Sequence, residues 1–352
     1  MLRKTVSGIM LTLLLIGMLT STLVKFVKTE SSIELSYDDG GFEWFVSAEL
    51  AKFAVNFSLP IGWSNARLIT ARFCLDDAMI FRLHIYDEAG ITDLIPPIDV
   101  PSPSNGWYDV DLSGLHVIVP QNFMIAKENI VEHYVPPYVG EDTSSPISNR
   151  SFYRLSGQSG WVLGTCNYAI RAVVMPTVDD VAVINLVHSK TGCLPMPTVG
   201  QNYNLSICVT VENQGDFEET FNLTAYANTT VIDELQVTLT FGENKTLTFT
   251  WNTTGFAYGN YTIWAYAWPV QNETDEEDNT LIGGTVLVSI AGDVNGDHLV
   301  DISDLVITVG AIPSSPTINP ENWNPNTDIN SDGVCDISDL VICVGNIPSG
   351  PW

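Results

Sequence analysis

Near its C-terminus the chain repeats itself. The segments DVNGDHLVDISDLVITVGAIPSSP (293–316) and DINSDGVCDISDLVICVGNIPSGP (328–351) are identical at 16 of 24 positions and lie 35 residues apart. Repetition at this level indicates a duplicated structural unit. Each copy has Asp or Asn at loop positions 1, 3, 5, 9 and 12. These residues are Asp293, Asn295, Asp297, Asp301 and Asp304 in the first copy and Asp328, Asn330, Asp332, Asp336 and Asp339 in the second.

The alternating oxygen-bearing side chains match the donors that a hard divalent cation requires, because such a cation takes about six to eight oxygen ligands. Position 7 would add a backbone carbonyl, from Leu299 in the first loop and Val334 in the second. His298 in the first loop suggests a transition metal, but its oxygen-bearing neighbours argue against one. The sequence therefore predicts two bound calcium ions as cofactors.

The two loops differ at position 6, where a calcium loop of this type needs a left-handed backbone. Glycine adopts that conformation without strain, and the second loop has Gly333 there. The first loop has His298, a residue type that visits the left-handed region more often than most. We therefore expect the first loop to bind calcium, but more weakly than the second.

Helices are predicted after the loops, over 302–312 and 337–347, where Leu, Val and Ile recur at one-turn spacing. Pro313 and Pro348 end these patterns. No helix is predicted before either loop, because VLVSIAG is strand-like and NPENWNPNT contains two prolines. A loop with an exiting helix, duplicated, resembles a type I dockerin domain, and the resemblance covers about residues 291–352.

The dockerin resemblance implies a protein partner, a cohesin-like domain or another surface protein, bound through one helix face. In that family, loop positions 10 and 11 contribute much of the recognition; here they are Ile302, Ser303, Ile337 and Ser338. Isoleucine at position 10 departs from the usual Ser or Ala, which puts a familiar cohesin in doubt. The alternatives are an intramolecular clasp that includes Pro351 and Trp352, and calcium with a purely structural role.

Short alternating strands separated by turn residues fill the chain before the repeat, which predicts a mainly β fold. In ICVTVE, Ile207, Val209 and Val211 share one face of a strand; TLTFTWN does the same with Leu247, Phe249 and Trp251. The segments DVAVINLVHSKT, VENQG, NYTIWAYAWP and ETDEEDN resemble a CARDB domain over about 178–290. That resemblance implies an immunoglobulin-like β-sandwich that serves as a cell-adhesion-related spacer or interaction module.

The stretch 31–177 is predicted to be one all-β domain. Its segments YDDGGFEWFVSAELAKFAVNFSLP, NGWYDVDLSG and SFYRLSGQSGWVLGTCNYAIRAVV are similar to a jelly-roll-like β-sandwich seen beside secreted peptidases and surface proteins. The predicted fold class is thus two β-sandwiches, jelly-roll-like and then immunoglobulin-like, followed by a small helical dockerin with EF-hand-like calcium loops.

The first 30 residues predict export. Arg3 and Lys4 precede an apolar run from Ile9 to Leu19, a pattern typical of a signal peptide. An uncleaved anchor is the alternative, because the weakly apolar stretch extends to Val24. Either case predicts an extracellular protein, secreted or at the cell surface, with membrane contact only through an uncleaved segment.

Charge, sequons and cysteines agree with an extracellular setting. The net charge of −27, from 14 Lys and Arg against 41 Asp and Glu, disfavours nucleic-acid partners. Nine N-x-S/T sequons make a glycoprotein the expectation wherever the host has the machinery. They are Asn56, Asn149, Asn204, Asn222, Asn228, Asn244, Asn252, Asn260 and Asn272. The six cysteines permit disulfides, with Cys74–Cys166 and Cys193–Cys208 as candidate pairs.

No catalytic motif is found, so a non-enzymatic protein that docks to a partner or mediates adhesion is predicted. The alternative is a carbohydrate-binding accessory protein of polysaccharide breakdown whose first sandwich stacks sugars on tryptophans; a hydrolase with an unrecognised site is a third possibility. The tryptophans concerned are Trp44, Trp63, Trp107 and Trp161, and the carboxylates that a hydrolase would need are Glu43, Asp76, Asp77, Asp87 and Glu88. Core tryptophans and solvated turn acids are the expected explanation of both sets.

Overall fold

The computed structural model describes residues 31–76, 79–101, 105–130, 138–193 and 196–347. The predicted signal peptide, Asp77, Pro351 and Trp352 lie outside these ranges. The chain divides into two compact units, an N-terminal unit (Met1–Pro176) and a C-terminal unit (Thr177–Trp352). Strands make up 47% of the described residues and helices 8%, which confirms the mainly β prediction. In the described residues, no helix has the length and apolar character needed to cross a membrane.

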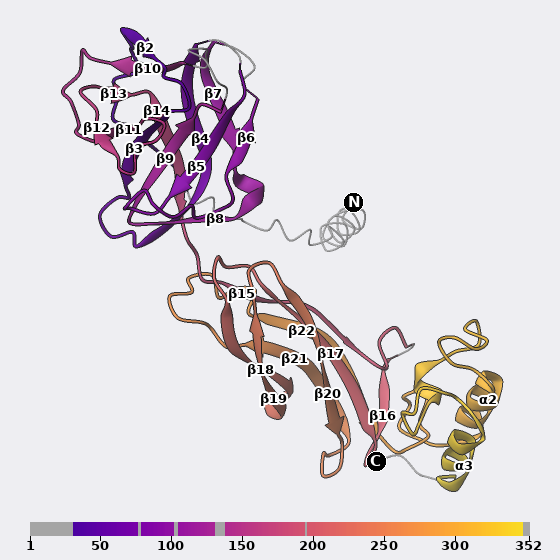
Figure 1. Cartoon of the computed structure of the whole chain (residues 1–352). Coiled ribbons are helices and arrows are strands. Elements are labelled where there is room, and N and C mark those ends of the chain that lie inside the picture. The colour runs from indigo at the N-terminus through magenta and orange to yellow at the C-terminus, as the bar shows by residue number, and fades with distance from the viewer. Residues whose placement is uncertain (1–30, 77–78, 102–104, 131–137, 194–195, 348–352) are drawn as a thin grey trace, which may run out of the picture. The chain divides into compact units, whose positions relative to one another are not determined.

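The N-terminal unit contains an eight-stranded and a six-stranded sheet, drawn in indigo to magenta in Figure 1. The larger sheet comprises β1 (Ile33–Leu35), β2 (Trp44–Val46), β4 (Asn65–Asp76), β7 (Gly106–Asp111), β8 (Val117–Pro120), β10 (Tyr138–Asp142), β13 (Asn167–Tyr168) and β14 (Ile170–Pro176). The smaller sheet comprises β3 (Lys52–Ser58), β5 (Phe81–Tyr86), β6 (Ile98–Val100), β9 (Asn122–Glu128), β11 (Ser151–Arg154) and β12 (Val162–Leu163). A short 3₁₀ turn, η1 (Ser113–Leu115), precedes β8.

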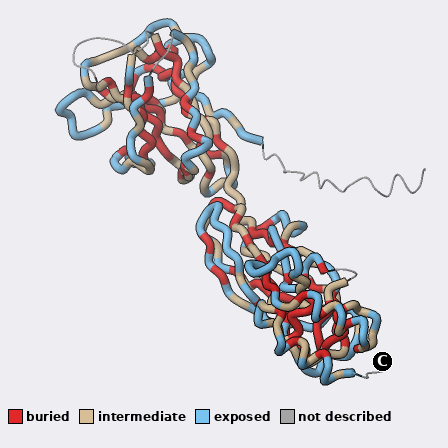
Figure 2. Tube along the Cα trace, turned by 90° about the vertical axis from the view of Figure 1, so that its right-hand side faces the viewer, coloured by how far each residue is buried: buried red, intermediate tan, exposed pale blue. Residues whose placement is uncertain are grey.

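Alternation along these strands builds one core from both sheets. Phe53, Val55 and Phe57 of β3 are buried with Phe73 of β4 and Phe123 of β9 in a single cluster. In Figure 2, buried stretches of the chain are drawn in red. The arrangement is consistent with the β-sandwich expected for this part of the chain.

The C-terminal unit begins with a second pair of sheets. Its three-stranded sheet comprises β15 (Val181–His188), β17 (Asn204–Asn213) and β20 (Asn244–Asn252). Its five-stranded sheet comprises β16 (Thr198–Gly200), β18 (Glu219–Ala227), β19 (Thr230–Leu239), β21 (Gly259–Ala267) and β22 (Thr280–Ser289). Among these strands, all pairings are antiparallel except the one between β16 and β22, which is parallel.

The predicted inner faces of this sandwich are correct. Ile207, Val209 and Val211 are fully buried, and Phe249 and Trp251 lie with them in the same core. The side chains between them face outward, and Thr210 and Thr246 share a 2.8 Å hydrogen bond between their hydroxyl groups across β17 and β20. One face of the sheet is therefore buried, and the other is a threonine-rich, solvent-exposed surface, called the wet face below.

Two helices follow the sandwich, α2 (Ile302–Ala311) and α3 (Ile337–Gly345), with a 3₁₀ turn η2 (Pro325–Thr327) between them. Strand β22 leads into the first calcium-type loop and η2 into the second, so in this described stretch no α-helix directly precedes either loop, as predicted. The helices share a small core with Val294, Val300, Ile329 and Cys343. A β-bridge between Ser314 and Cys335 joins the two copies of the repeat.

Candidate metal centre

The first loop is organised by the acid at its first position. Asp293 Oδ1 accepts hydrogen bonds from the backbone N–H groups of Gly296 (2.8 Å) and Asp297 (3.1 Å), and Oδ2 accepts from that of His298 (3.1 Å). Asn295 Oδ1 accepts from the N–H of Asp297, and Asp297 Oδ1 from that of Leu299. These contacts curl the loop around Asp293, as a cation-binding loop requires.

The second loop reproduces the pattern at the equivalent positions. Asp328 accepts from the backbone N–H groups of Asp332 and Gly333, each at 3.0 Å. Asn330 Oδ1 accepts from the N–H of Asp332, and Asp332 Oδ1 from that of Val334, also at 3.0 Å. Two loops with different residues at positions 4 and 6 thus adopt the same hydrogen-bonded geometry.

Positions 9 and 12 connect each loop to its helix. Asp301 is the N-cap of α2 and forms a capping box with Asp304; Asp336 and Asp339 do the same for α3. Asp304 and Asp339 each also accept two backbone N–H groups from the start of their own loop. Each position-12 acid is fully buried. From the first turn of its helix, it holds the start of the loop against the end of the loop.

Both loops use a left-handed backbone at two positions, of which only one was predicted. Position 6 has φ values of +74° at His298 and +89° at Gly333. Position 4 is also left-handed, with +76° at Gly296 and +61° at Ser331. Each loop therefore contains one glycine and one residue that adopts this conformation at a cost. Backbone strain was expected only in the first loop, but the second loop has an equivalent strained residue. Strain therefore gives no reason to expect weaker calcium binding by the first loop.

Burial raises the pKa of three of the loop acids. Desolvation raises the pKa of Asp293, Asp304 and Asp328, although backbone hydrogen bonds act in the opposite direction on each. A buried anion is stabilised by a nearby cation. This concentration of desolvated carboxylates favours occupation by a positive charge.

The donor set fits calcium in chemistry, with amide, carboxylate and backbone oxygens at positions 1, 3, 5, 7, 9 and 12. Among the described residues, however, no group of three or more His, Cys, Asp or Glu side chains is arranged so that it could hold a metal ion. Calcium coordination would therefore need the Asn side chains, the carbonyls of Leu299 and Val334, and a turn of the exposed acids toward the loop centre. Calcium binding remains a prediction.

A lysine of the sandwich reaches the second loop. Lys190, in the connection after β15, is 2% exposed, and its Nζ donates to the backbone carbonyls of Pro325 and Asp328. Burial lowers the pKa of Lys190, and the negative charge of Asp328 opposes that change. Sequence reasoning missed this residue, because nothing in the sequence links position 190 to a loop so distant along the chain.

Asn326 forms a second connection between the sandwich and the repeat. Its Nδ2 donates to the carbonyls of Met196 (2.9 Å) and Val294 (3.1 Å), and its Oδ1 accepts from the N–H of Thr198 (2.9 Å). Ser331 Oγ donates to the carbonyl of Asn204 at 2.6 Å. The second loop is thus held to the sandwich on two sides. Because it is held in this way, the repeat is part of the sandwich's structure rather than a freely tethered module.

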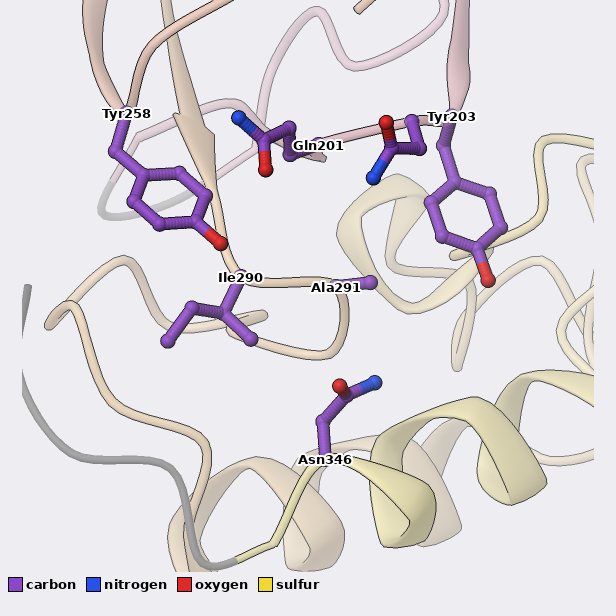
Figure 3. A pocket seen from close by; sticks show the side chains of 7 residues that line it. Gln201, Tyr203, Tyr258, Ile290, Ala291 and Asn346 are labelled. Carbon is purple, nitrogen blue, oxygen red and sulfur yellow. The ribbon is translucent and has the colours of Figure 1, made fainter. Parts of the chain in front are cut away.

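A pocket of about 440 Å³ lies where the sandwich meets the end of α3 (Figure 3). Gln201, Tyr203 and Tyr258 come from the sandwich, and Asn346 follows α3. None of the predicted calcium ligands lines it. The pocket is therefore separate from the candidate metal centre.

The carboxylates considered for hydrolysis bind local partners in the N-terminal unit. Glu43 accepts from the N–H of Thr143, Asp76 from Asn105, Asp87 from Ile91 and Thr92, and Glu88 from Asn122. These contacts fit turn acids.

The four tryptophans meet different surroundings. Trp63 packs on the main core, Trp161 on a smaller one, Trp107 lies under the Arg171 guanidinium and Trp44 is exposed. They therefore do not share the single role in sugar stacking that the alternative function requires.

All six cysteines are free, so the two candidate disulfides are wrong. Cys166 Sγ donates to Glu141, and Cys208 lies on the wet face of β17 beside Thr248, whereas Cys193 is buried. The members of the second pair thus face different environments. Desolvation also raises the pKa of the Cys74 thiol to about 12, which disfavours the thiolate that disulfide exchange requires.

Residues 186–282 form a CARDB domain: the CARDB family matches this stretch, which spans most of the second sandwich. Two similar solved structures are the CARDB domain of the PF1109 protein from Pyrococcus furiosus, in complex with di-metal ions, and a domain of an inferred cell-surface protein from Methanosarcina acetivorans. The first is 27% identical, with 32% of this chain and 89% of that chain covered and a TM-score of 0.26. The second is 26% identical, with 32% and 92% covered and a TM-score of 0.25.

A β-glucosidase from Listeria innocua also matches, at 16% identity over 32% of this chain and 16% of that chain, with a TM-score of 0.22. These TM-scores are low, so the structural similarities carry no argument about function. No curated protein matches the chain.

Proposed function

We propose that this chain is an exported, non-enzymatic cell-surface protein in which a CARDB domain presents a dockerin-like, calcium-binding module to a protein partner. The CARDB domain supports a surface role related to adhesion. The two loops, each followed by a capped helix, support two calcium ions, and the resemblance to type I dockerins supports a cohesin-like partner. The acidic charge of the chain suits an extracellular setting that is rich in calcium.

The docking surface in this proposal is the outer face of the two helices. On α2, Ile302, Val306 and Val309 are 66%, 64% and 51% exposed. On α3, Ile337, Val341 and Val344 have exposures of 64%, 64% and 51%. Exposed β-branched residues at one-turn spacing form an apolar stripe on each helix, and such stripes are typical of surfaces that bind another protein. Isoleucine at position 10 makes these stripes more apolar than the usual family residue would, which favours a partner with an apolar contact surface.

The observation that carries the proposal is the agreement between the two loops. Asp293 and Asp328, Asn295 and Asn330, and Asp304 and Asp339 make equivalent hydrogen bonds, although the loops differ at four other positions besides their ligands. The five side-chain oxygen positions that both copies share are also donors of the kind that a calcium ion takes.

The docking claim is tested with the whole chain immobilised, in calcium and in a chelator, against a cohesin-like domain. We expect calcium-dependent binding that Val306→Glu and Val341→Glu together reduce at least tenfold, because each places a charge within the apolar stripe. Thr220→Glu, at an exposed position on the wet face of β18, is the matched control and should leave binding unchanged. Binding that survives the double substitution, or that needs no calcium, contradicts the proposed surface.

A further inference from the structure

The outer face of the five-stranded sheet carries an apolar strip that neither the core nor the calcium module uses. Val231 of β19, Tyr226 of β18, Trp264 of β21 and Ile282 of β22 lie side by side across four strands. Val231 and Ile282 are 53% and 68% exposed. Folded proteins rarely expose a contiguous apolar row of this kind to solvent. We therefore expect a ligand, a partner or a covalent modification to cover it.

The aromatic members of the strip are arranged as a pair. The rings of Tyr226 and Trp264 are stacked, with centroids 4.0 Å apart and an interplanar angle of 6°. Tyr266 and Trp268 follow along the chain from Trp264, with centroids 5.5 Å apart. Indole and phenol rings with polar neighbours suit the apolar faces and hydroxyl groups of sugar rings.

Three of the nine sequons lie beside this strip, which indicates what covers it. Asn222 and Asn260 lie on β18 and β21, and Asn228 occupies the two-residue turn between β18 and β19. Trp264 Nε1 donates to the backbone carbonyl of Asn228 at 2.7 Å, so the aromatic pair adjoins this turn directly. Asn228 is therefore the sequon with an aromatic surface beside it.

The Asn228 side chain is also fixed in place. Its Oδ1 accepts from the N–H of Thr262 at 2.8 Å, and its Nδ2 donates to the carbonyl of Asn260 at 3.3 Å. An amide nitrogen has two hydrogens, and this contact uses one of them. By contrast, the threonine of the Asn222 sequon, Thr224, is buried, whereas Thr230 of the Asn228 sequon is exposed.

We propose that Asn228 carries an N-linked glycan whose first sugars pack on the Tyr226–Trp264 pair and cover the strip. Attachment forms a bond from Asn228 Nδ2 to the anomeric carbon of an oligosaccharide supplied on a lipid phosphate. The anomeric carbon–oxygen bond to the phosphate breaks, the phosphate leaves with the electron pair, and the amide proton passes to a base of the host transferase. The proposal concerns this face alone; it rests on the proposed export of the chain and does not depend on calcium or docking.

The test uses the whole chain secreted from a host that glycosylates exported proteins, with peptide mass spectrometry to map the modified asparagines. Thr230→Ala removes this sequon and leaves the Asn228 contacts in place; Asn244→Gln, at an exposed site on β20, is the matched control. We expect Asn228 to be modified, and Thr230→Ala to lower the Tm of the C-terminal unit by about 2–4 °C, the shift expected from one aromatic contact in a domain of this size. Asn244→Gln is expected to leave the Tm unchanged.

A second comparison tests whether the Tm shift caused by the glycan depends on the stacked Tyr226 and Trp264 rings. The Tm difference caused by enzymatic removal of the glycan is measured in the natural sequence and in Trp264→Ala, so that any loss of stability from the substitution itself cancels. We expect the difference to disappear in Trp264→Ala. An unmodified Asn228 overturns the proposal, and so does a glycan that gives the same Tm difference with and without Trp264. Trp264-dependent binding of a soluble polysaccharide to unglycosylated protein would also overturn it, in favour of an external sugar ligand.

Discussion

Replacing Lys190 with methionine tests how the CARDB sandwich and the second loop depend on each other. The change keeps an apolar stem of similar length and removes the ammonium group that donates to the carbonyls of Pro325 and Asp328. Each buried carbonyl that loses its donor costs about 1–3 kcal/mol. The two together predict a loss of about 2–6 kcal/mol, which at about 2–4 °C per kcal/mol lowers the Tm by about 4–24 °C in a domain of this size.

Calcium changes the size of this effect. Lys190 lies against Asp328, so its charge offsets part of the negative charge that would attract an ion to the second loop. Without the lysine, that loop should attract calcium more strongly, and in saturating calcium the variant regains about 1.4 kcal/mol for each tenfold decrease of its Kd below that of the natural sequence. We therefore expect a larger stability loss in chelator than in calcium.

The assay is hydrogen exchange followed by mass spectrometry, with peptides from residues 323–340 compared with peptides from the N-terminal unit in the same sample. Lys245→Met, at an exposed lysine of β20, is the control. Equal protection in Lys190→Met and the natural sequence, with and without calcium, would refute the reasoning. It would mean that burying the ammonium costs as much as its two contacts contribute.

Three further predictions concern the ligands, the strained positions and pH. Asp304→Asn and Asp339→Asn should each lower the number of calcium ions bound from two to one in a calorimetric titration, and a stoichiometry still at two would exclude position 12 as a ligand. His298→Gly should raise the unfolding free energy of the C-terminal unit by about 1 kcal/mol by relieving left-handed strain, and an unchanged unfolding free energy would show that the strain is absent. Burial, with the nearby charge of Asp179, raises the pKa of Glu219 to about 7, so its contribution to stability is present below the unfolded pKa and is lost as pH rises through about 7. The unfolding free energy of the C-terminal unit should therefore fall between about pH 5 and pH 8 by more in the natural sequence than in Glu219→Gln, and parallel pH curves would contradict this.

The parts of the fold that could be predicted from sequence are those set by local periodicity. Alternation placed Ile207, Val209 and Val211 inside the second sandwich, and one-turn spacing of apolar residues predicted helices that the structure has as Ile302–Ala311 and Ile337–Gly345. The absence of a helix before each loop also followed from local signals, namely strand-like residues before the first loop and prolines before the second. The CARDB resemblance was confirmed over 186–282.

The features that could not be predicted depend on contacts between residues that lie far apart in the sequence. No local pattern relates Lys190 or Asn326 to the partners that they meet across the sandwich and the repeat. The strip of Tyr226, Trp264 and Ile282 depends on strand order and register, which alternation in a single strand does not define. The candidate disulfides failed for the same reason, because an even cysteine count says nothing about which thiols come together.

One local signal was available and missed. Gly296 and Ser331 hold the same loop position, and the glycine in the first copy indicates a left-handed residue in both. Comparing the two copies position by position would have placed the strain at Ser331 as well as at His298.

The central claim is that the duplicated loops bind calcium and that the bound ions stabilise the C-terminal unit. The most direct measurement is calorimetric titration of calcium into the whole chain, with the Tm of the C-terminal unit followed in parallel. The account predicts two bound ions per chain and a Tm that rises with calcium concentration. No heat of binding together with a Tm that calcium leaves unchanged would contradict it, and the repeat would then be a helical cap on the CARDB sandwich rather than a metal centre.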